Sequence, residues 1–265
     1  MKTITKIATQ KKAGRYSIDL DKQFAFGVSE SVLIKYGLAK GRELDDALIE
    51  QIKHDDEVAK AFNTAINYLG HALRTIKQVK QKLTEKAVSE AIQNQAIVQL
   101  KELGYLDDAN YAMHYVATKK LISPKGPNAI KTDLKQAGIL EDDIEMALES
   151  YTYEEQIEIA QKMATKFANT YKRESTRAKQ QKIIQALANK GFSFDIGQVV
   201  VAELDVGNDD ETELDNVKRQ AEKLWHRYRN EPLSQRQYKT KSHLYTKGYH
   251  REVIDIIMLA LESES

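Results

Sequence analysis

The sequence predicts a mainly α-helical chain whose tandem three-helix repeats form a curved, elongated solenoid behind a small N-terminal segment that contains a β-hairpin. Three observations support this fold class. Only 12 Gly and 3 Pro occur among 265 residues, and 30% of the residues are charged, which is typical of helices. A pattern repeats four times after residue 61, as in stacked repeat proteins. The first 28 residues alternate apolar and polar side chains instead, which is the period of strands.

The N-terminal segment has the pattern of a hairpin. Residues 4–8 and 16–20 alternate, and the turn-prone Lys11–Gly14 lies between them, so two antiparallel strands are expected. Residues 24–28 extend the alternation into a third strand.

Two short helices should follow this segment. Ser29 is a suitable N-cap for the first helix, and Gly37 is a suitable end; the second should begin at about Asp45.

The remainder of the chain carries an internal repeat in which Leu, three residues, a small residue and an apolar residue follow one another. The small residues lie 51, 53 and 57 positions apart. Each copy should be the end of one helix, a left-handed cap and the start of the next helix. Leu100 and Gly104 fit the same short pattern out of phase. The four copies are Leu83/Ala87/Val88, Leu134/Gly138/Ile139, Leu187/Gly191/Phe192 and Leu244/Gly248/Tyr249.

An amphipathic segment precedes each later copy, for example from Ile157 to Tyr171 and from Val217 to Tyr228, so each repeat should have three helices. Such repeats stack on their neighbours, and function then belongs to an extended face. The predicted division is an N-terminal segment, 1–60, and four repeats at 61–107, 108–153, 154–212 and 213–265.

Charge is segregated although the net charge is only +1. The second helix of every repeat is basic, whereas residues 141–158 and 195–215 carry acids without Lys or Arg. Lined up along a solenoid, the basic helices would form a stripe that contacts phosphates or an acidic protein groove. We expect binding through Arg74, Lys77, Lys80, Lys82, Lys125, Lys131, Arg173, Arg177, Lys179, Lys182, Arg236, Lys239 and Lys241. The alternative interpretation is that these charged residues only form the solvent-exposed faces of their helices.

Aromatic residues accompany the stripe and have two interpretations. Side chains of this kind could stack on bases, but such residues are more often packing residues. The candidates are Tyr171, Trp225, Tyr228, Tyr238 and Tyr245.

No catalytic or metal-binding pattern is readable. Cysteine is absent, and the six histidines show no ligand spacing. Adjacent Asp pairs would allow a magnesium nuclease, but most fit helix starts, where they complement the helix dipole. The turn around Gly37 and Gly41 lacks the Lys and hydroxyl of a phosphate loop. We therefore expect no enzyme, no cofactor and no metal, and the absence of a signal or membrane span predicts a soluble, cytoplasmic protein.

The chain resembles the regulatory protein RecX family of Gram-positive type. The resemblance is carried by residues 4–44, by Ala65–Leu69 with Arg74-Thr75, by Leu103–Asp108, and by Lys125–Pro127 with the Leu134/Gly138/Ile139 copy. It implies a non-catalytic protein that binds RecA, lodges in the groove of its filament, and inhibits strand exchange and coprotease activity.

The implied partners are the RecA filament and single-stranded DNA, with double-stranded DNA as a further candidate, and the implied state is a monomer. Shorter members of the family have three repeats, so the fourth repeat here is additional. Ala87 stands where a Gly is expected, at a cost of up to about 1 kcal/mol if that position is left-handed.

Two alternatives stay open from the residues. Three-helix units with basic second helices are compatible with a helical-repeat DNA-binding protein that acts on transcription. A scaffold resembling tetratricopeptide repeats, which binds acidic or helical peptides without nucleic acid, is the other.

Overall fold

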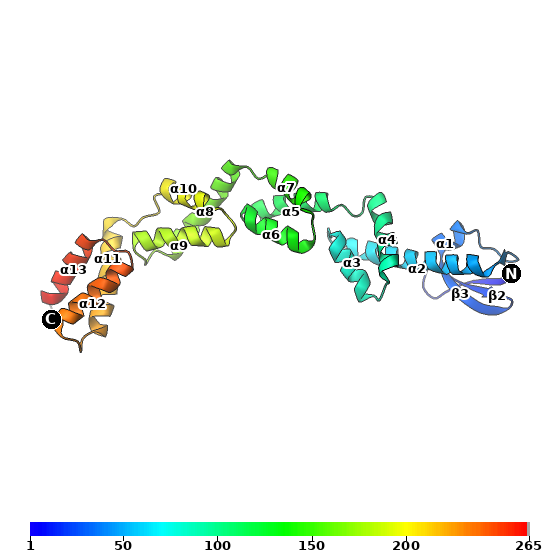
Figure 1. The fold of residues 1–265 in the computed structure, drawn as a ribbon, viewed down its shortest axis with the longest axis horizontal. Helices are drawn as coiled ribbons and strands as arrows, with labels where there is room; N and C mark the ends of the chain where they lie inside the picture. The colour runs from blue at the N-terminus through cyan, green and yellow to red at the C-terminus, as the bar shows by residue number, and fades with distance from the viewer. Residues whose placement is uncertain (264–265) are drawn as a thin grey trace. The chain divides into compact units, whose positions relative to one another are not determined.

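The computed structural model describes residues 1–263 and contains, in that range, a small sheet followed by helices (Figure 1). It divides into two compact units, of which the first comprises residues 1–112 and 135–143, and the second comprises residues 113–134 with the described residues from 144 onward. The predicted fold class is confirmed in its mostly helical composition, its tandem three-helix repeats and its N-terminal strands. The curvature and elongation of the solenoid stay predictions.

The N-terminal strands form an antiparallel sheet in the order β3-β2-β1-β4, made of β1 (Lys2–Thr9), β2 (Arg15–Leu20), β3 (Gln23–Ser29) and β4 (Glu43–Leu44). The predicted hairpin and third strand are therefore confirmed. The register pairs Ile4 with Leu20 and Ile18 with Phe26, so the alternating apolar side chains share one buried face. Sequence reasoning missed β4, because two residues carry no readable period.

Two capped helices follow the sheet. Ser29 accepts a hydrogen bond from the Val32 amide and begins α1 (Glu30–Lys35), and Asp45 caps α2 (Asp46–Leu69). The second helix is 24 residues long, not short as expected. Its first half packs against the sheet through residues 49 and 52, and its second half enters the core of the first repeat through residues 61 and 65. The predicted boundary at residue 60 falls inside this helix.

Each repeat consists of three helices. The second half of α2 serves as the first helix of repeat 1. Repeat 1 continues with α3 (Ile76–Glu85) and α4 (Glu90–Glu102), and repeat 2 has α5 (Asp108–Leu121), α6 (Pro127–Ala137) and α7 (Glu141–Glu149). Repeat 3 has α8 (Tyr153–Thr170), α9 (Thr176–Asn189) and α10 (Phe194–Glu203). Repeat 4 has α11 (Asp210–Arg227), α12 (Leu233–Thr246) and α13 (Arg251–Ser263). The exact boundaries between repeats stay a prediction.

The repeated sequence pattern marks the end of each second helix, as predicted. The four Leu side chains are fully buried. The small residues all have positive φ, with values of 57°, 89°, 92° and 86° from the first repeat to the fourth. Ala87 is therefore left-handed, the conformation that normally favours glycine. Gly104 also has a positive φ, of 73°, and follows the end of α4, so the short pattern marks left-handed helix ends of more than one kind.

Repeats 3 and 4 share helix lengths that repeats 1 and 2 lack. Their first helices both have 18 residues and their second helices both have 14. The second helices of repeats 1 and 2 have 10 and 11 residues. The fourth repeat therefore resembles the third in its first and second helices.

Candidate partner-binding surface

The second helices, which carry the predicted basic stripe, meet end to end at three junctions. At each junction the N-terminus of one second helix donates hydrogen bonds to carbonyls at the C-terminus of the second helix in the following repeat. This arrangement brings the positive end of one helix dipole to the negative end of the next. The contacts are Thr75 Oγ1 to Ala137 O (2.8 Å), Gly126 N to Lys190 O (2.7 Å), Asn128 N to Gly191 O (3.0 Å) and Ser175 Oγ to Lys247 O (2.5 Å).

The residue that directly precedes each of the first three second helices donates a hydrogen bond across its junction. Thr75 and Ser175 accept from their own helix amides and donate across the junction with the same hydroxyl. Gly126 has no hydroxyl, and its backbone amide donates instead. Pro232 caps α12 without a side-chain hydrogen bond and has no amide proton, and no following repeat is present among the described residues.

The left-handed glycines have a second role at these junctions, because they leave space for the start of the neighbouring second helix. A Cβ on Gly191 would lie 2.4 Å from Ala129 Cβ, and one on Gly138 would lie 2.7 Å from Lys77 Cδ. Ala87, at the corresponding position in repeat 1, is exposed. The first repeat therefore tolerates a methyl group where the later repeats need contact space.

Acidic side chains complete two of the junctions. Asp108, at the start of α5, accepts a hydrogen bond from the Ile76 amide at 2.9 Å, and Glu213 accepts from the Thr176 amide at 3.0 Å. Both carboxylates lie at the N-terminus of a second helix, where the dipole favours a negative charge. The expectation that most Asp pairs mark helix starts holds for Asp45, Asp107 and Asp209, which cap α2, α5 and α11.

Several predicted cations are already paired within their own repeat. The partners and N–O distances are Lys82 with Glu85 (2.8 Å), Lys125 with Asp133 (2.6 Å), Lys131 with Glu145 (3.6 Å), Lys182 with Glu174, Lys239 with Glu231 (2.5 Å) and Lys241 with Asp255 (2.7 Å). These side chains are partly or fully exposed, so their ion pairs are weak. Because carboxylates lie beside these cations, the surface of the second helices is less positive than the sequence indicates.

Six further predicted cations have no salt-bridge partner in residues 1–263. Lys77 donates to the Gln136 carbonyl at 2.8 Å and so takes part in a junction. Arg236 donates to the Trp225 carbonyl and lies 3.9 Å from the centroid of that ring. The others are Arg74, Lys80, Arg173 and Arg177, of which the last two are exposed. Of the predicted cations without an acidic partner, Lys77 and Lys80 lie on α3, and Arg177 lies at the start of α9.

Lys179 does not belong to an exposed stripe, and its predicted role as a surface contact is wrong on this point. Its side chain is buried, and its Nζ donates to Asn208 Oδ1 at 3.0 Å and to the Gly207 carbonyl at 3.3 Å. Burial is the main cause that lowers the pKa of this amine. Counted from the N-caps, Lys179 occupies the position of the buried Val79 and Ile130.

Aromatic rings at or near the ends of the first helices lie under these cations. The distances from cation to ring centroid are 4.7 Å for Arg74 over Tyr68, 5.8 Å for Lys82 over Tyr68, 5.7 Å for Lys182 over Tyr171 and 5.6 Å for Lys239 over Tyr228. Trp225 is buried, whereas Tyr238 and Tyr245 are exposed. Sequence reasoning missed Tyr68, whose position near the end of α2 was the available signal.

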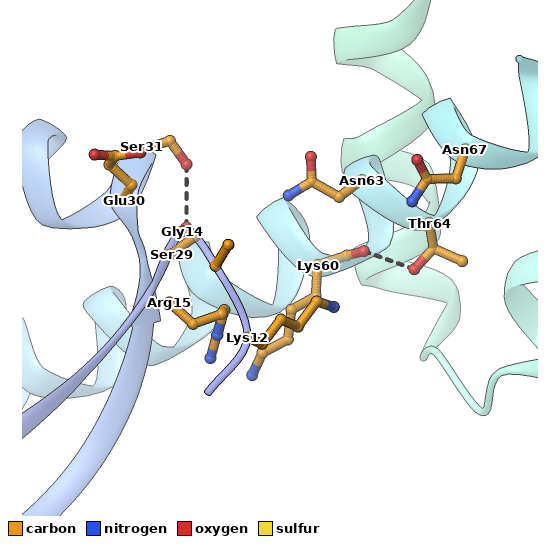
Figure 2. Close-up of a pocket in the computed structure, with 11 residues that line it drawn as sticks. Lys12, Gly14, Arg15, Ser29, Glu30, Ser31, Lys60, Asn63, Thr64 and Asn67 are labelled. Carbon is orange, nitrogen blue, oxygen red and sulfur yellow. Dashed lines mark hydrogen bonds between the residues drawn. The ribbon is translucent and has the colours of Figure 1, made fainter. Parts of the chain in front are cut away.

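A polar cleft of about 490 Å³ lies between the β1–β2 turn and α2 (Figure 2). Lys12 and Arg15 line it from the turn, and Lys60 lines it from α2. The buried Asp56 carboxylate binds Arg15 Nη1 at 2.7 Å, Lys60 Nζ at 2.9 Å and the Ser29 amide at 2.7 Å. Two of the cations are thereby neutralised, so the cluster ties the hairpin to α2.

Other kinds of site find no support in the described part of the chain. No group of three or more His, Asp or Glu side chains could hold a metal ion there. No described helix is both long enough and apolar enough to cross a membrane.

The fold and the junctions define a protein of tandem three-helix repeats, and the comparisons with known proteins identify its family. The regulatory protein RecX N-terminal domain matches residues 2–45, and the first and second three-helix domains of RecX match residues 61–100 and 107–148. The third three-helix domain matches twice, at residues 154–201 and 211–258. The chain belongs to the regulatory protein RecX family, and its fourth repeat resembles the third domain.

Individual relatives agree over nearly the whole chain. The regulatory protein RecX of Leuconostoc mesenteroides is 68% identical, and the match covers 99% of this chain and 98% of the relative. That of Bacillus subtilis is 36% identical over 97% of this chain and 98% of the relative. A crystal structure of regulatory protein RecX, 39% identical, aligns with a TM-score of 0.69 over 76% of this chain and 98% of that chain.

Proposed function

We propose that this chain is a non-enzymatic, cytoplasmic regulator that binds RecA and its DNA filament and inhibits recombinase and coprotease activity. The observation that carries the proposal is the match of RecX domain models to the N-terminal segment and to all four repeats. The cations without acidic partners on α3 and α9 support it, because such side chains can contact DNA phosphates or acids on a protein filament.

The mechanism we propose is multivalent. Repeats that each present a modest basic surface can contact successive subunits of a helical polymer, and tethering raises the effective concentration of each later contact. Single-stranded DNA is the expected nucleic acid, with double-stranded DNA as a further candidate, and the regulator should act as a monomer.

The test is a salt series of binding to RecA filaments and to bare single-stranded DNA. The variant Lys80→Glu/Lys82→Glu should weaken filament binding mildly, and adding Arg173→Glu and Arg177→Glu should weaken it far more than proportionately. A matched control replaces the exposed Lys40, Lys166, Lys218 and Lys223 by Glu, which changes the net charge equally away from the second helices. Full binding by the four-site variant, or equal loss in the control, would contradict the proposal. A footprint at a defined operator would favour a regulator of transcription instead.

A further inference from the structure

Two positions beside the second helix carry a recurring charge pair when they are counted from the N-cap residue. One position directly precedes the N-cap, and the other lies seven residues after it. In repeat 3 these are Glu174 and Lys182, and in repeat 4 they are Glu231 and Lys239; both pairs form salt bridges. The two positions are therefore close enough in space for a direct ion pair.

Repeat 2 has the same pair with the charges exchanged. Lys125 precedes the N-cap, Asp133 lies seven residues after it, and their charged atoms are 2.6 Å apart. Tyr115 also donates to Asp133, at 2.8 Å. Three repeats thus satisfy this site with one carboxylate and one cation, in either order.

Repeat 1 departs from the rule because both positions are cationic. Arg74 precedes the N-cap Thr75, and Lys82 lies seven residues after it, and both lie within 6 Å of the Tyr68 ring centroid. Within residues 1–263, Arg74 has no salt-bridge partner, and its Nε is buried without a hydrogen-bond partner. The acid that pairs with Lys82 is the exposed Glu85, and exposed pairs of this kind are weak.

We infer that Arg74, Lys82 and Tyr68 form a receptor for a carboxylate supplied by an acidic segment of a partner protein. In each of the other three repeats one of these two positions holds an Asp or Glu side chain, and its carboxylate pairs with the cation at the other position. A guanidinium can also bind a carboxylate with two parallel hydrogen bonds. In identifying that partner as the RecA filament, the inference rests on the proposed function.

The charge pattern allows two tests, one in which a substitution removes the carboxylate-binding site and one in which a substitution creates a second such site. Arg74→Glu should rebuild the pair seen in repeats 3 and 4 and remove the receptor, whereas Glu174→Arg should create a second receptor over Tyr171. The probes are a fluorescent ten-residue Asp/Glu peptide and a single-stranded oligothymidylate of equal charge. Arg74→Glu should weaken peptide binding about tenfold and weaken oligonucleotide binding by a smaller factor. Glu174→Arg should raise the number of bound peptides from one to two, and the double variant should return it to one.

Two outcomes would overturn the inference, namely unchanged peptide affinity in Arg74→Glu or a selective loss of oligonucleotide binding, which would assign the site to phosphates. Arg74→Glu should keep its helical circular dichroism, since Glu already occupies this position twice; if it does not, Lys82→Gln tests the same site. Failure of the wild-type protein to bind RecA filaments would contradict the proposed function and leave the peptide result intact.

Discussion

Gly191→Ala should destabilise the junction between α6 and α9 through two separable effects. The residue has a φ of 92°, and a side chain in a left-handed conformation costs about 1 to 2 kcal/mol. The added Cβ would also lie 2.4 Å from both Ala129 N and Ala129 Cβ. Overpacking of this kind costs about 1 to 3 kcal/mol more. The total loss expected in the free energy of unfolding is therefore about 2 to 5 kcal/mol.

Gly104→Ala is the matched control for this change. Gly104 has a φ of 73°, and a Cβ there would meet no atom within 4 Å, so only the conformational cost of about 1 to 2 kcal/mol applies. Urea unfolding followed by circular dichroism, with hydrogen exchange of the amides at residues 126 and 128, measures both variants. Equal losses in the two variants, with unchanged protection at the junction, would refute the role assigned to close approach.

Three further changes follow from buried polar contacts. Asp56→Asn should cost about 3 to 5 kcal/mol at pH 7, because it leaves Arg15 without its buried partner. Burial raises the pKa of Asp56, but its hydrogen bonds lower it more. The loss in the free energy of unfolding of Asp56→Asn, measured by urea unfolding, should therefore become smaller as the pH falls below about 4. A loss that does not change with pH would contradict this role of the Asp56 carboxylate. Ser175→Ala removes an N-cap and the donor to the Lys247 carbonyl. Thermal melting should show a loss of about 1 to 3 kcal/mol in the free energy of unfolding. An unchanged free energy of unfolding would contradict a stabilising role of this junction. Lys179→Glu should lower the free energy of unfolding by about 3 kcal/mol or more. A variant that is as stable as the wild type and defective only in binding would contradict the burial of Lys179.

The periodic features of the fold could be predicted from the sequence because they depend on neighbouring residues. The alternation of residues 4–8 and 16–20 gave the hairpin, and the four Leu-to-small patterns gave the helix ends. The extension of α2 through residue 60 was not predictable in the same way, since one helix serves two cores there.

The binding surface was less predictable, because ion pairing depends on which helices meet. Basic composition alone placed Lys179 and Lys239 on one stripe, although the first is buried and the second pairs with Glu231. Counting from the N-cap would have aligned Lys179 with Val79 and Ile130. This alignment, unlike the basic composition, would have predicted that Lys179 is buried. Ala87 became interpretable only when the junctions showed that the later glycines contact a neighbouring helix.

The most direct test of the central claim is the rate of ATP hydrolysis by RecA on single-stranded DNA, measured while the purified protein is added at substoichiometric amounts. A regulator that binds along the filament should slow hydrolysis and strand exchange together, and the four-site Glu variant at residues 80, 82, 173 and 177 should lose most of this effect. Unchanged hydrolysis and strand exchange in the presence of folded protein would contradict the account.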